Sequence, residues 1–409
     1  MRVMVMTGPV PTHLMPLLPQ VWALRGAGHR VLLAAQPDLA ATARAAGLPM
    51  AVIGTEQREI AARRAHRAAG GRDAGGDTRQ VPPYEALARR LRDRMDDVLG
   101  PALRVAREWR PDLVLADPLE YASLVVGGVL GVPVVHHRWG VDSLSSRVGH
   151  VRDALRETCL GHGLTGGLPA PALVLDPCPP SLQAPGATPA RPVRFVPGTG
   201  SGLVPDWASR KTARRRICVT LGLRTVALEG AAVLARLLQG LGRLPDTETV
   251  VTVDPADRAE LGPLPRSVRL VDPAPLDLFL TTCDAVVHHG GSGTGLAAIA
   301  AGLPQLVVPQ TPWTAEHGER VEALGAGLLA PQSAAPEDIA AAAGELLADP
   351  RHRDGARRLR EEMRATPSPA ETVPALVRLA GRERGTGAAP LRVEASSSAA
   401  LHHLAAQGG

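Results

Sequence analysis

The chain has 409 residues and is short of aromatic side chains and of lysine. Phe, Trp and Tyr make up 2% of it, and Lys211 is the only lysine. Proteins that bind single-stranded nucleic acid stack bases on aromatic rings, and two Phe and two Tyr cannot build such a platform. The arginines behind the net charge of +5 are dispersed, and Arg214 to Arg216 form their longest run. We therefore expect a solvated, arginine-rich surface and no nucleic-acid partner.

Cysteine is also scarce, and its spacing is wide. The four cysteines are Cys159, Cys178, Cys218 and Cys283, and no two of them form a CxxC pair. Zinc sites and disulfide frameworks need closer or more numerous cysteines. We expect reduced thiols, as in the cytosol, and no structural zinc.

Long hydrophobic runs are missing as well. No segment approaches the roughly 20 apolar residues that a membrane-spanning helix needs. The N-terminus, MRVMVMTGPVPTHLMP, lacks the charged region, the long apolar region and the cleavage site of a signal peptide. These absences predict a cytoplasmic protein without a membrane span.

What the chain does have is 45% hydrophobic residues and an alternation of short apolar runs with helical periodicity. In the first half, strands are predicted at 2–7, 31–35, 50–53, 113–116 and 132–136. Helices are predicted between them at 16–27, 38–46, 83–109 and 120–130. Further short strands are expected at 173–175 and 193–196, and the stretch 63–79 is expected to be a mobile loop. This order is typical of a parallel, doubly wound sheet.

A second series follows a stretch dense in Pro and Gly. Strands are predicted at 217–221, 249–253, 268–271, 285–288 and 305–308. Helices are predicted at 229–241, 275–281, 294–301, 315–324, 336–348 and 351–364. The fold class is thus α/β, with two Rossmann-like domains that face each other across a cleft. We place their bounds at 1–200 and 214–385, with a linker at 201–213 and a frayed tail at 386–409. A ligand is expected in the cleft, at the carboxyl ends of the strands.

Residues 288–295 read HHGGSGTG and stand where a strand ends and a helix begins. Unpaired N–H groups at a helix start, next to glycines, are suited to binding phosphate. Ser292 and Thr294 can add hydroxyl donors. A glycine turn without a ligand is the simpler alternative. A dinucleotide-dependent oxidoreductase is another, since residues 293–298 match GxGxxA. The next strand ends at Pro309-Gln310, without the acidic residue that would bind a ribose, and this disfavours the oxidoreductase.

Residues 288–310, HHGGSGTGLAAIAAGLPQLVVPQ, closely resemble the donor-binding segment of bacterial family 1 glycosyltransferases of the GT-B fold. Within them, the segment is most similar to the group that attaches deoxysugars to antibiotics. Three other stretches resemble that family in the right order: 11–16, 110–117 and 176–182. The resemblance covers about residues 1–382.

The resemblance implies roles for particular residues. His13 would be the base that takes the proton of the acceptor hydroxyl, and Asp117 would orient it. His289 would bind the leaving diphosphate and His288 would only pack. The other implied donor-binding residues are Gly222, Gly290, Gly291, Ser292, Gly293 and Thr294. The reaction would be inverting. Because no DxD sequence occurs, we expect no metal ion, and no cofactor besides the nucleotide-sugar co-substrate.

Two parts of the resemblance bear on specificity. Trp313-Thr314 stands where many relatives have Asp-Gln, which holds sugar hydroxyls. This difference predicts a deoxysugar donor on thymidine diphosphate, unless Trp313 merely packs a loop. The acceptor, a polyketide by resemblance, is expected against the 60–95 and 142–160 regions and against residues 136–139. Of these, His137, Arg138 and Trp139 are the candidate contacts, and a purely structural role for them is the alternative.

Three other hypotheses stay open. A C-glycosyltransferase of the same fold is disfavoured by His13, which suits an oxygen nucleophile. A non-catalytic nucleotide-sugar-binding partner of another transferase is disfavoured by the intact pair of His13 and Asp117. The active enzyme itself could depend on an auxiliary activator protein or on a homodimer.

Overall fold

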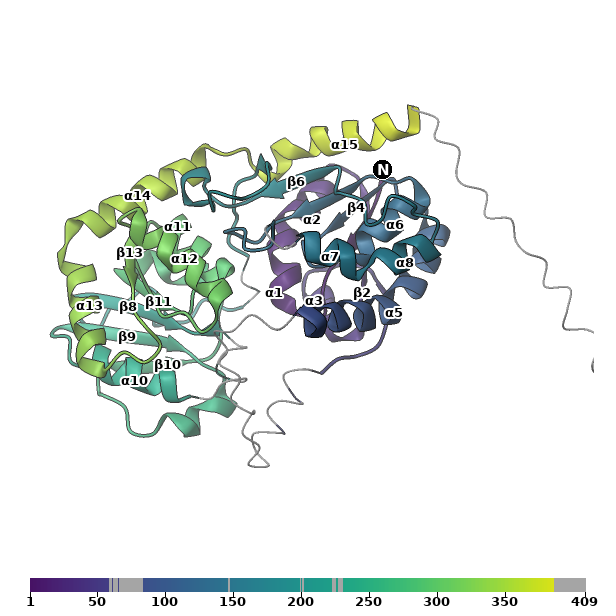
Figure 1. Cartoon of the computed structure of the whole chain (residues 1–409). Coiled ribbons are helices and arrows are strands. Elements are labelled where there is room, and N and C mark those ends of the chain that lie inside the picture. Colours follow the sequence, from purple (N-terminus) through teal and green to yellow (C-terminus); the bar gives the residue numbers. More distant parts are fainter. Residues whose placement is uncertain are drawn as a thin grey trace, which may run out of the picture.

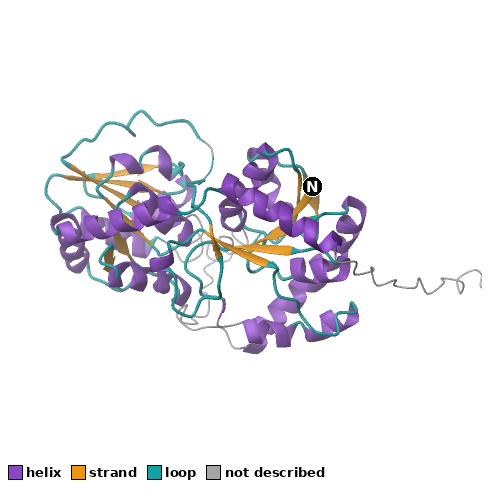
Figure 2. Ribbon diagram, turned by 90° about the horizontal axis from the view of Figure 1, so that it is seen from above, coloured by secondary structure: helices purple, strands orange, loops and turns teal. Residues whose placement is uncertain are grey.

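The chain forms two α/β halves, each built on one parallel sheet (Figure 1). Figure 2 displays the strands of both sheets in orange with helices packed around them. This computed structural model describes residues 1–58, 61, 65, 84–145, 148–198, 200, 202–222, 226 and 231–385. The predicted α/β class with two Rossmann-like sheets is confirmed.

The N-terminal sheet has seven parallel strands in the order β3-β2-β1-β4-β5-β6-β7. They are β1 Arg2–Met6, β2 Arg30–Ala35, β3 Met50–Val52, β4 Leu113–Ala116, β5 Val134–His137, β6 Leu173–Asp176 and β7 Arg191–Pro192. β1 is central, because it pairs with β2 on one side and with β4 on the other. The strand predicted at 193–196 is wrong in position, since β7 ends at Pro192.

Helices cover both faces of this sheet. They are α1 Pro11–Leu14, α2 Leu18–Gly26, α3 Ala40–Ala45, α5 Tyr84–Trp109, α6 Ala122–Leu130, α7 Val148–Ala154 and α8 Arg156–Gly161, with 3-10 turns at Met15–Leu17, Pro37–Leu39 and Pro180–Leu182. Side chains alternate along β1, so Met4 and Met6 face α5 and α6, and Val3 and Val5 face α2. Instead of one helix over 16–27, the chain makes three short helical pieces from Pro11 onward. Each has a proline in its first turn, where proline is tolerated.

The C-terminal sheet has six parallel strands in the order β10-β9-β8-β11-β12-β13. They are β8 Arg215–Thr220, β9 Thr247–Thr252, β10 Val268–Val271, β11 Ala285–His288, β12 Gln305–Val307 and β13 Gly327–Leu329. The sequence predicted five of them and missed β13, whose three residues are too few to make a pattern. This strand order is that of the dinucleotide-binding fold.

The helices of this half also pack on both faces. They are α10 Ala232–Leu241, α11 Ser292–Ala301, α12 Pro312–Ala323, α13 Pro336–Ala348 and α14 Pro350–Ala365, with a 3-10 helix at Pro255–Leu261. α10 and α13 cover one face, and α11 and α14 cover the other. The helix predicted at 275–281 is wrong: two 3-10 turns, Leu276–Leu278 and Leu280–Thr282, flank Phe279, whose φ of −139° is not helical.

The last helix, α15 Pro369–Gly385, leaves the C-terminal half and lies on the N-terminal one (yellow in Figure 1). Val373, Leu376 and Ala380 are buried in the same core as Val21 and Leu24 of α2. Gln20 of α2 donates a hydrogen bond to the carbonyl of Pro369. The two halves are therefore joined by the chain at two places, near residue 205 and near residue 367.

Two sequence-based expectations concern parts outside the described residues. The mobile loop predicted at 63–79 lies outside the described residues except for position 65. The frayed tail predicted at 386–409 lies outside them entirely. Among the helices that the structure does describe, none is both long enough and apolar enough to cross a membrane.

Candidate active site

The predicted base and its partner both lie at the carboxyl edge of the N-terminal sheet. His13 is in α1, just after β1, and Asp117 directly follows β4. β1 and β4 are neighbours, and strand order reverses between them. Ligands of open α/β sheets bind at such a switch point. The topology thus brings together two residues that are 104 positions apart in the sequence.

Asp117 is fully buried and tightly held, whereas His13 is partly accessible. Nδ1 of His13 lies 3.7 Å from Oδ1 of Asp117, and 19% of the His13 side chain is exposed. The backbone N–H of Gly8 donates to Oδ2 at 2.7 Å, and that of Leu119 donates to Oδ1 at 2.8 Å. Burial by itself raises the pKa of Asp117, but His13 and the N–H of Gly8 hold it below its ordinary value. The carboxylate is therefore charged and points at the imidazole.

The predicted phosphate turn follows β11 and opens α11. Gly291 is the N-cap of α11, so the first N–H groups of the helix, at Ser292, Gly293 and Thr294, start at the turn. Gly290 has a φ of +89°, and a Cβ there would lie 2.1 Å from the carbonyl oxygen of Thr314. Glycine is thus required at 290, both by the left-handed backbone and by the approach of α12.

His289 lies between two glycines of this half. A Cβ on Gly291 would lie 2.5 Å from its Nε2, and one on Gly222 would lie 2.9 Å from its Cε1. Gly222 follows β8, and β8 and β11 flank the switch point of the C-terminal sheet. Burial lowers the pKa of His289 to about 4, so the ring is neutral at pH 7 and can donate one N–H. Its Nδ1 is buried and has no hydrogen-bond partner among the described residues.

His288 is fully buried and packs against the turn from the protein interior. Its Nδ1 accepts the N–H of Gly290 at 3.1 Å, so its Nε2 carries the proton and donates to Oε1 of Gln305 at 2.9 Å. The same oxygen accepts from Nε2 of His317 in α12 at 3.0 Å. Burial lowers the pKa of His288 well below its ordinary value and that of His317 to about 4. We call His288, Gln305 and His317 the buried imidazole network.

Trp313 is in the first turn of α12, next to the glycine turn. The hydroxyl of Thr314 accepts the N–H groups of Gln310 at 3.2 Å and Thr311 at 3.0 Å and donates to the carbonyl of Thr311 at 2.9 Å. This hydroxyl is already engaged in capping the helix. Positions 313 and 314 therefore present an indole and a hydroxyl that is already engaged.

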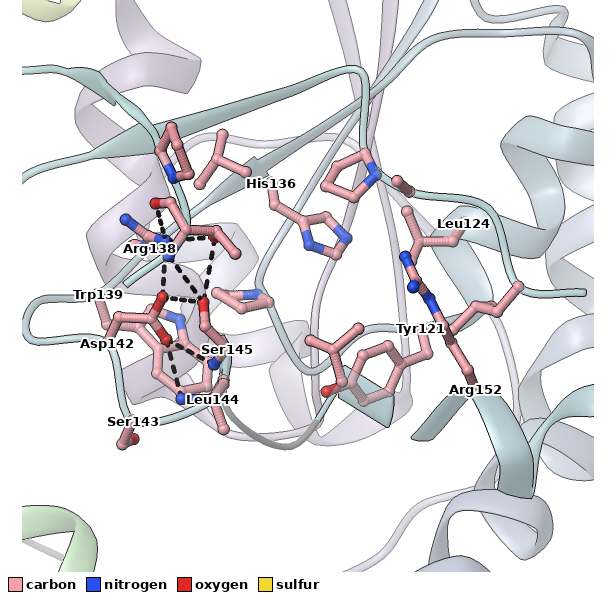
Figure 3. A pocket seen from close by; sticks show the side chains of 18 of the residues that line it. Tyr121, Leu124, His136, Arg138, Trp139, Asp142, Ser143, Leu144, Ser145 and Arg152 are labelled. Carbon is pink, nitrogen blue, oxygen red and sulfur yellow. Dashed lines mark hydrogen bonds and ion pairs between the residues drawn. The ribbon is translucent and has the colours of Figure 1, made fainter. Parts of the chain in front are cut away.

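A cavity of about 300 Å³ opens in the N-terminal half, between the ends of β4 and β5 and helix α7 (Figure 3). Tyr121, Leu124, His136 and Trp139 line it, with several prolines and aliphatic side chains. Burial lowers the pKa of His136 to about 4 and raises that of Tyr121 to about 12. Both of these side chains are neutral at pH 7. The lining is mainly apolar, with Arg152 and the paired Arg138 and Asp142 as its charged members, so the cavity suits a mainly apolar molecule.

The three residues predicted to bind the acceptor have different surroundings. Trp139 lines the cavity, and its ring lies 4.3 Å from that of His13. His137 points to the opposite side of β5 from His136, and its Nδ1 lies 2.7 Å from the carbonyl oxygen of Arg138. His137 is therefore not at the cavity, and its neighbour His136 is. The sequence predicted that residues 136–139 line the acceptor site as a group. The alternation of side chains along β5 is what separates His136 from His137.

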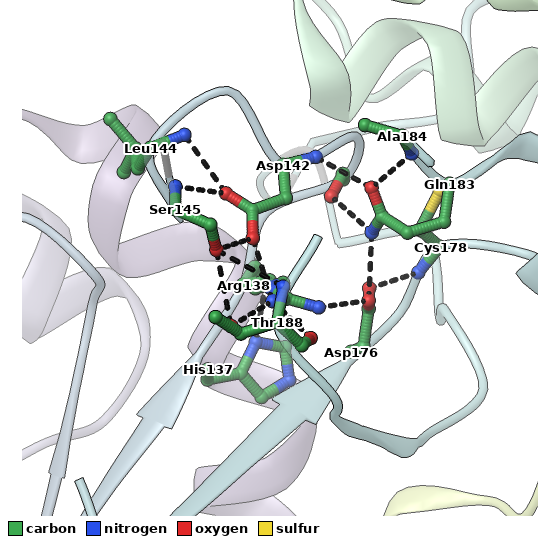
Figure 4. Close-up of polar contacts among 11 residues, drawn as sticks. His137, Arg138, Asp142, Leu144, Ser145, Asp176, Cys178, Gln183, Ala184 and Thr188 are labelled. Atoms are coloured by element: carbon green, nitrogen blue, oxygen red, sulfur yellow. Dashed lines mark hydrogen bonds and ion pairs between the residues drawn. The ribbon is translucent and has the colours of Figure 1, made fainter. Parts of the chain in front are cut away.

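Arg138 borders the cavity but is held by the protein itself (Figure 4). Its guanidinium pairs with Asp176 at 2.8 Å and with Asp142 at 2.6 Å and donates to the carbonyl of Thr188 at 2.7 Å. Only 6% of the residue is exposed. The charge of Arg138 is thus neutralised within the N-terminal half, and its contacts hold the loop 138–145 in place.

Comparison with known proteins places this geometry in a family. Residues 22–222 match the N-terminal domain, and residues 235–379 the C-terminal domain, of the erythromycin biosynthesis protein CIII-like family. The chain is 36% identical to tylactone mycaminosyltransferase of Streptomyces fradiae, over 91% of each chain. It is 33% identical to 10-deoxymethynolide desosaminyltransferase of Streptomyces venezuelae, over 94% of this chain and 98% of that one.

Solved structures agree in fold. Spinosyn rhamnosyltransferase SpnG superposes with a TM-score of 0.81 at 39% identity, over 92% of this chain and all of that one. The glycosyltransferase SnogD from Streptomyces nogalater superposes with a TM-score of 0.76 at 34% identity, over 93% of this chain and 99% of that one. The chain therefore belongs to the erythromycin biosynthesis protein CIII-like family, within the antibiotic deoxysugar group of GT-B glycosyltransferases.

Proposed function

We propose that this glycosyltransferase moves a deoxysugar from thymidine diphosphate to a hydroxyl of a polyketide-type acceptor, with inversion and without a metal ion. The observation that carries the proposal is the pair of His13 and buried Asp117 at the edge that faces the glycine turn. SpnG has been solved with thymidine diphosphate and with spinosyn aglycone, which supports the two substrate classes.

In this mechanism His13 acts as the general base. Its Nδ1 is turned toward Asp117, which leaves Nε2 for the acceptor hydroxyl. The hydroxyl oxygen attacks the anomeric carbon, the bond from that carbon to the diphosphate oxygen breaks, and the hydroxyl proton passes to Nε2. The charged carboxylate of Asp117 then stabilises the imidazolium. One displacement on the face opposite the leaving group inverts the anomeric centre.

The departing diphosphate gains negative charge and would be held at the start of α11. The free N–H groups there, the hydroxyls of Ser292 and Thr294, and one N–H of His289 are the donors that the chain offers. These donors suffice without a cation in the proposed mechanism. Turnover that is unchanged by EDTA would support metal independence, and loss of turnover restored by Mg²⁺ would refute it.

The donor class rests on Trp313 and Thr314. A carboxylate accepts hydrogen bonds from sugar hydroxyls, and an amide both accepts and donates. An indole can accept none, and the hydroxyl of Thr314 is already used in the helix cap. We therefore expect a thymidine-diphosphate deoxyhexose to be used at least tenfold more efficiently than the fully hydroxylated hexose, about 1.4 kcal/mol of discrimination. Equal kcat/KM for the two donors would contradict this part of the proposal.

The deciding experiment compares His13→Ala and Asp117→Asn with the wild-type chain on a panel of polyketide aglycones. Removing a general base lowers kcat by about 10² to 10⁴ while thymidine diphosphate still binds, because the nucleotide site is in the other half. Near-wild-type turnover by His13→Ala would refute the base assignment. NMR of the product distinguishes an O-glycoside from a C-glycoside and gives the anomer.

The same assay addresses the remaining alternatives. A non-catalytic nucleotide-sugar-binding partner would bind thymidine diphosphate but give no product with any acceptor, unless a second transferase is added. Size-exclusion chromatography of the active fraction tests the predicted homodimer or auxiliary activator protein.

A further inference from the structure

Two consecutive residues after β5, Trp139 and Gly140, lie between the predicted base and the donor turn. Both also line the cavity, where Figure 3 labels Trp139.

Trp139 contacts the base directly. The centroids of its ring and the His13 ring are 4.3 Å apart, with 36° between the planes. Gly8 also approaches the imidazole closely, since a Cβ there would lie 2.8 Å from Nδ1. The imidazole is therefore confined by both Gly8 and the indole. This confinement fixes its orientation, although its 3.7 Å distance to Asp117 is longer than a hydrogen bond.

Gly140 contacts the opposite half. A Cβ on Gly140 would lie 2.8 Å from Cβ and 3.0 Å from Oγ of Ser292, and 3.6 Å from Cδ1 of Leu296. The backbone of Gly140 is not left-handed, so glycine is not needed there for its conformation. It is needed for the close approach of the two halves.

The loop 138–145, which contains Gly140, is held in place by hydrogen bonds and ion pairs. Gln183 donates from Nε2 to the carbonyl of Gly140 at 3.3 Å and to Asp176 at 2.7 Å, and its Oε1 accepts the N–H of Asp142 at 2.7 Å (Figure 4). Arg138 pairs with Asp142 and Asp176. A methyl group at position 140 would therefore push the C-terminal half away as a unit, together with Ser292, and would leave the loop and the donor turn intact.

We propose that Trp139 and Gly140 are positioning residues that together set the separation between His13 and the diphosphate turn. Trp139 orients the imidazole, and Gly140 allows the C-terminal half to approach until the anomeric carbon is within reach of the acceptor hydroxyl. Because the same two residues form part of the cavity wall, the acceptor is bound at the place where the spacing is set. This inference rests on the proposed role of His13 as the base.

The first test is Gly140→Ala. A displacement of about 1 Å between reacting groups can cost on the order of 100-fold in rate, so we expect kcat to fall by roughly that factor. The Kd for thymidine diphosphate, measured by calorimetry, should stay within about twofold of wild type, since the nucleotide is held by the C-terminal half. The matched control is Gly149→Ala in α7, where a Cβ meets nothing within 4 Å.

The second test is Trp139→Ala beside Trp139→Phe. The first removes the ring that confines His13 and should lower kcat, again without weakening thymidine diphosphate. The second keeps an aromatic face and should restore most of the rate. A role in folding alone would lower the melting temperature and nucleotide binding together, and Phe would not rescue kcat selectively.

The outcomes separate this inference from the proposed function. If His13→Ala is inactive while Gly140→Ala and Trp139→Ala turn over like wild type, the positioning role is wrong and the base assignment stands. If Gly140→Ala loses thymidine diphosphate binding as much as turnover, the spacing argument is also wrong. If His13→Ala is as active as wild type, the proposed mechanism itself fails.

Discussion

At the scale of single residues, the proposed diphosphate site depends on glycines without a side chain as much as on hydrogen-bond donors. Gly222 and Gly291 both leave room for the ring of His289, and at either position a Cβ would lie within 3.0 Å of it. The neutral ring has one N–H, which in the proposed site would donate to an oxygen anion. Gly222 stays a predicted donor-binding residue, and the room that it leaves for His289 supports that prediction.

His289→Ala should weaken donor binding specifically. A hydrogen bond to a charged group contributes about 1.5–3 kcal/mol, so the Kd for thymidine diphosphate should rise by roughly tenfold or more. Isothermal titration calorimetry measures it. His162→Ala, which removes an exposed imidazole far from the turn, is the control. An unchanged Kd in His289→Ala would remove His289 from the site.

At the scale of elements, the turn between β11 and α11 is held from the protein interior by the buried imidazole network. Gln305 of β12 accepts from His288 of β11 and from His317 of α12, so three elements are tied together beneath the turn. Gly295 is also required here, because a Cβ would lie 2.1 Å from Nε2 of His317. Sequence reasoning assigned no role to Gln305, although this residue lies within the segment 288–310, and it missed His317, which is in no motif.

This network makes the stability of the protein depend on pH. Burial depresses the pKa of His317 from 6.5 to about 4, so between these values the ring is neutral when folded and protonated when unfolded. The free energy of unfolding should therefore fall as the pH is lowered from about 6.5 toward 4. From pH 7 to pH 5 this one histidine accounts for a loss on the order of 2 kcal/mol.

His317→Gln should reduce that pH dependence, because Gln can still donate to Gln305 but does not titrate. Urea unfolding at pH 7 and pH 5 measures the difference in the free energy of unfolding for both proteins. The exposed residue His162 again provides the control, as His162→Gln. An identical difference in wild type and His317→Gln would contradict the assignment.

At the scale of the whole molecule, α15 ties the two halves together. It follows the last helix of the C-terminal half but contributes Val373, Leu376 and Ala380 to the N-terminal core. Arg194, after β7, also donates to the carbonyl of Thr366 at 3.1 Å. The domain bounds of 1–200 and 214–385 stay a prediction. The packing of α15, which lies within 214–385, makes this helix part of the N-terminal half.

Leu376→Ala should destabilise the N-terminal half through the cavity it leaves. Leu376 is fully buried, and such substitutions cost about 2–5 kcal/mol. Val377 is next to it and 42% exposed, so Val377→Ala should change stability by only about 0.5 kcal/mol. Thermal unfolding followed by circular dichroism compares the two variants. Equal effects would show that α15 does not pack as described.

The sequence by itself determined the class of fold, the order of most strands and helices, and the phosphate turn. These follow from local patterns: apolar runs of strand length, helical periodicity, and glycines at a helix start. Where it was wrong, at 193–196, 275–281 and the single helix over 16–27, the pattern was short or interrupted by proline. The assignments of His13 and Asp117 came from resemblance, since nothing local distinguishes a catalytic histidine from any loop histidine.

Only the tertiary structure decided which side chains meet. Strand order places His13 beside Asp117, strand alternation puts His136 rather than His137 in the cavity, and the approach of the two halves puts Gly140 against Ser292. Each of these contacts joins segments that are far apart in the chain or depends on which face of a strand is buried. Such contacts are set by packing between elements, which no pattern within one element encodes.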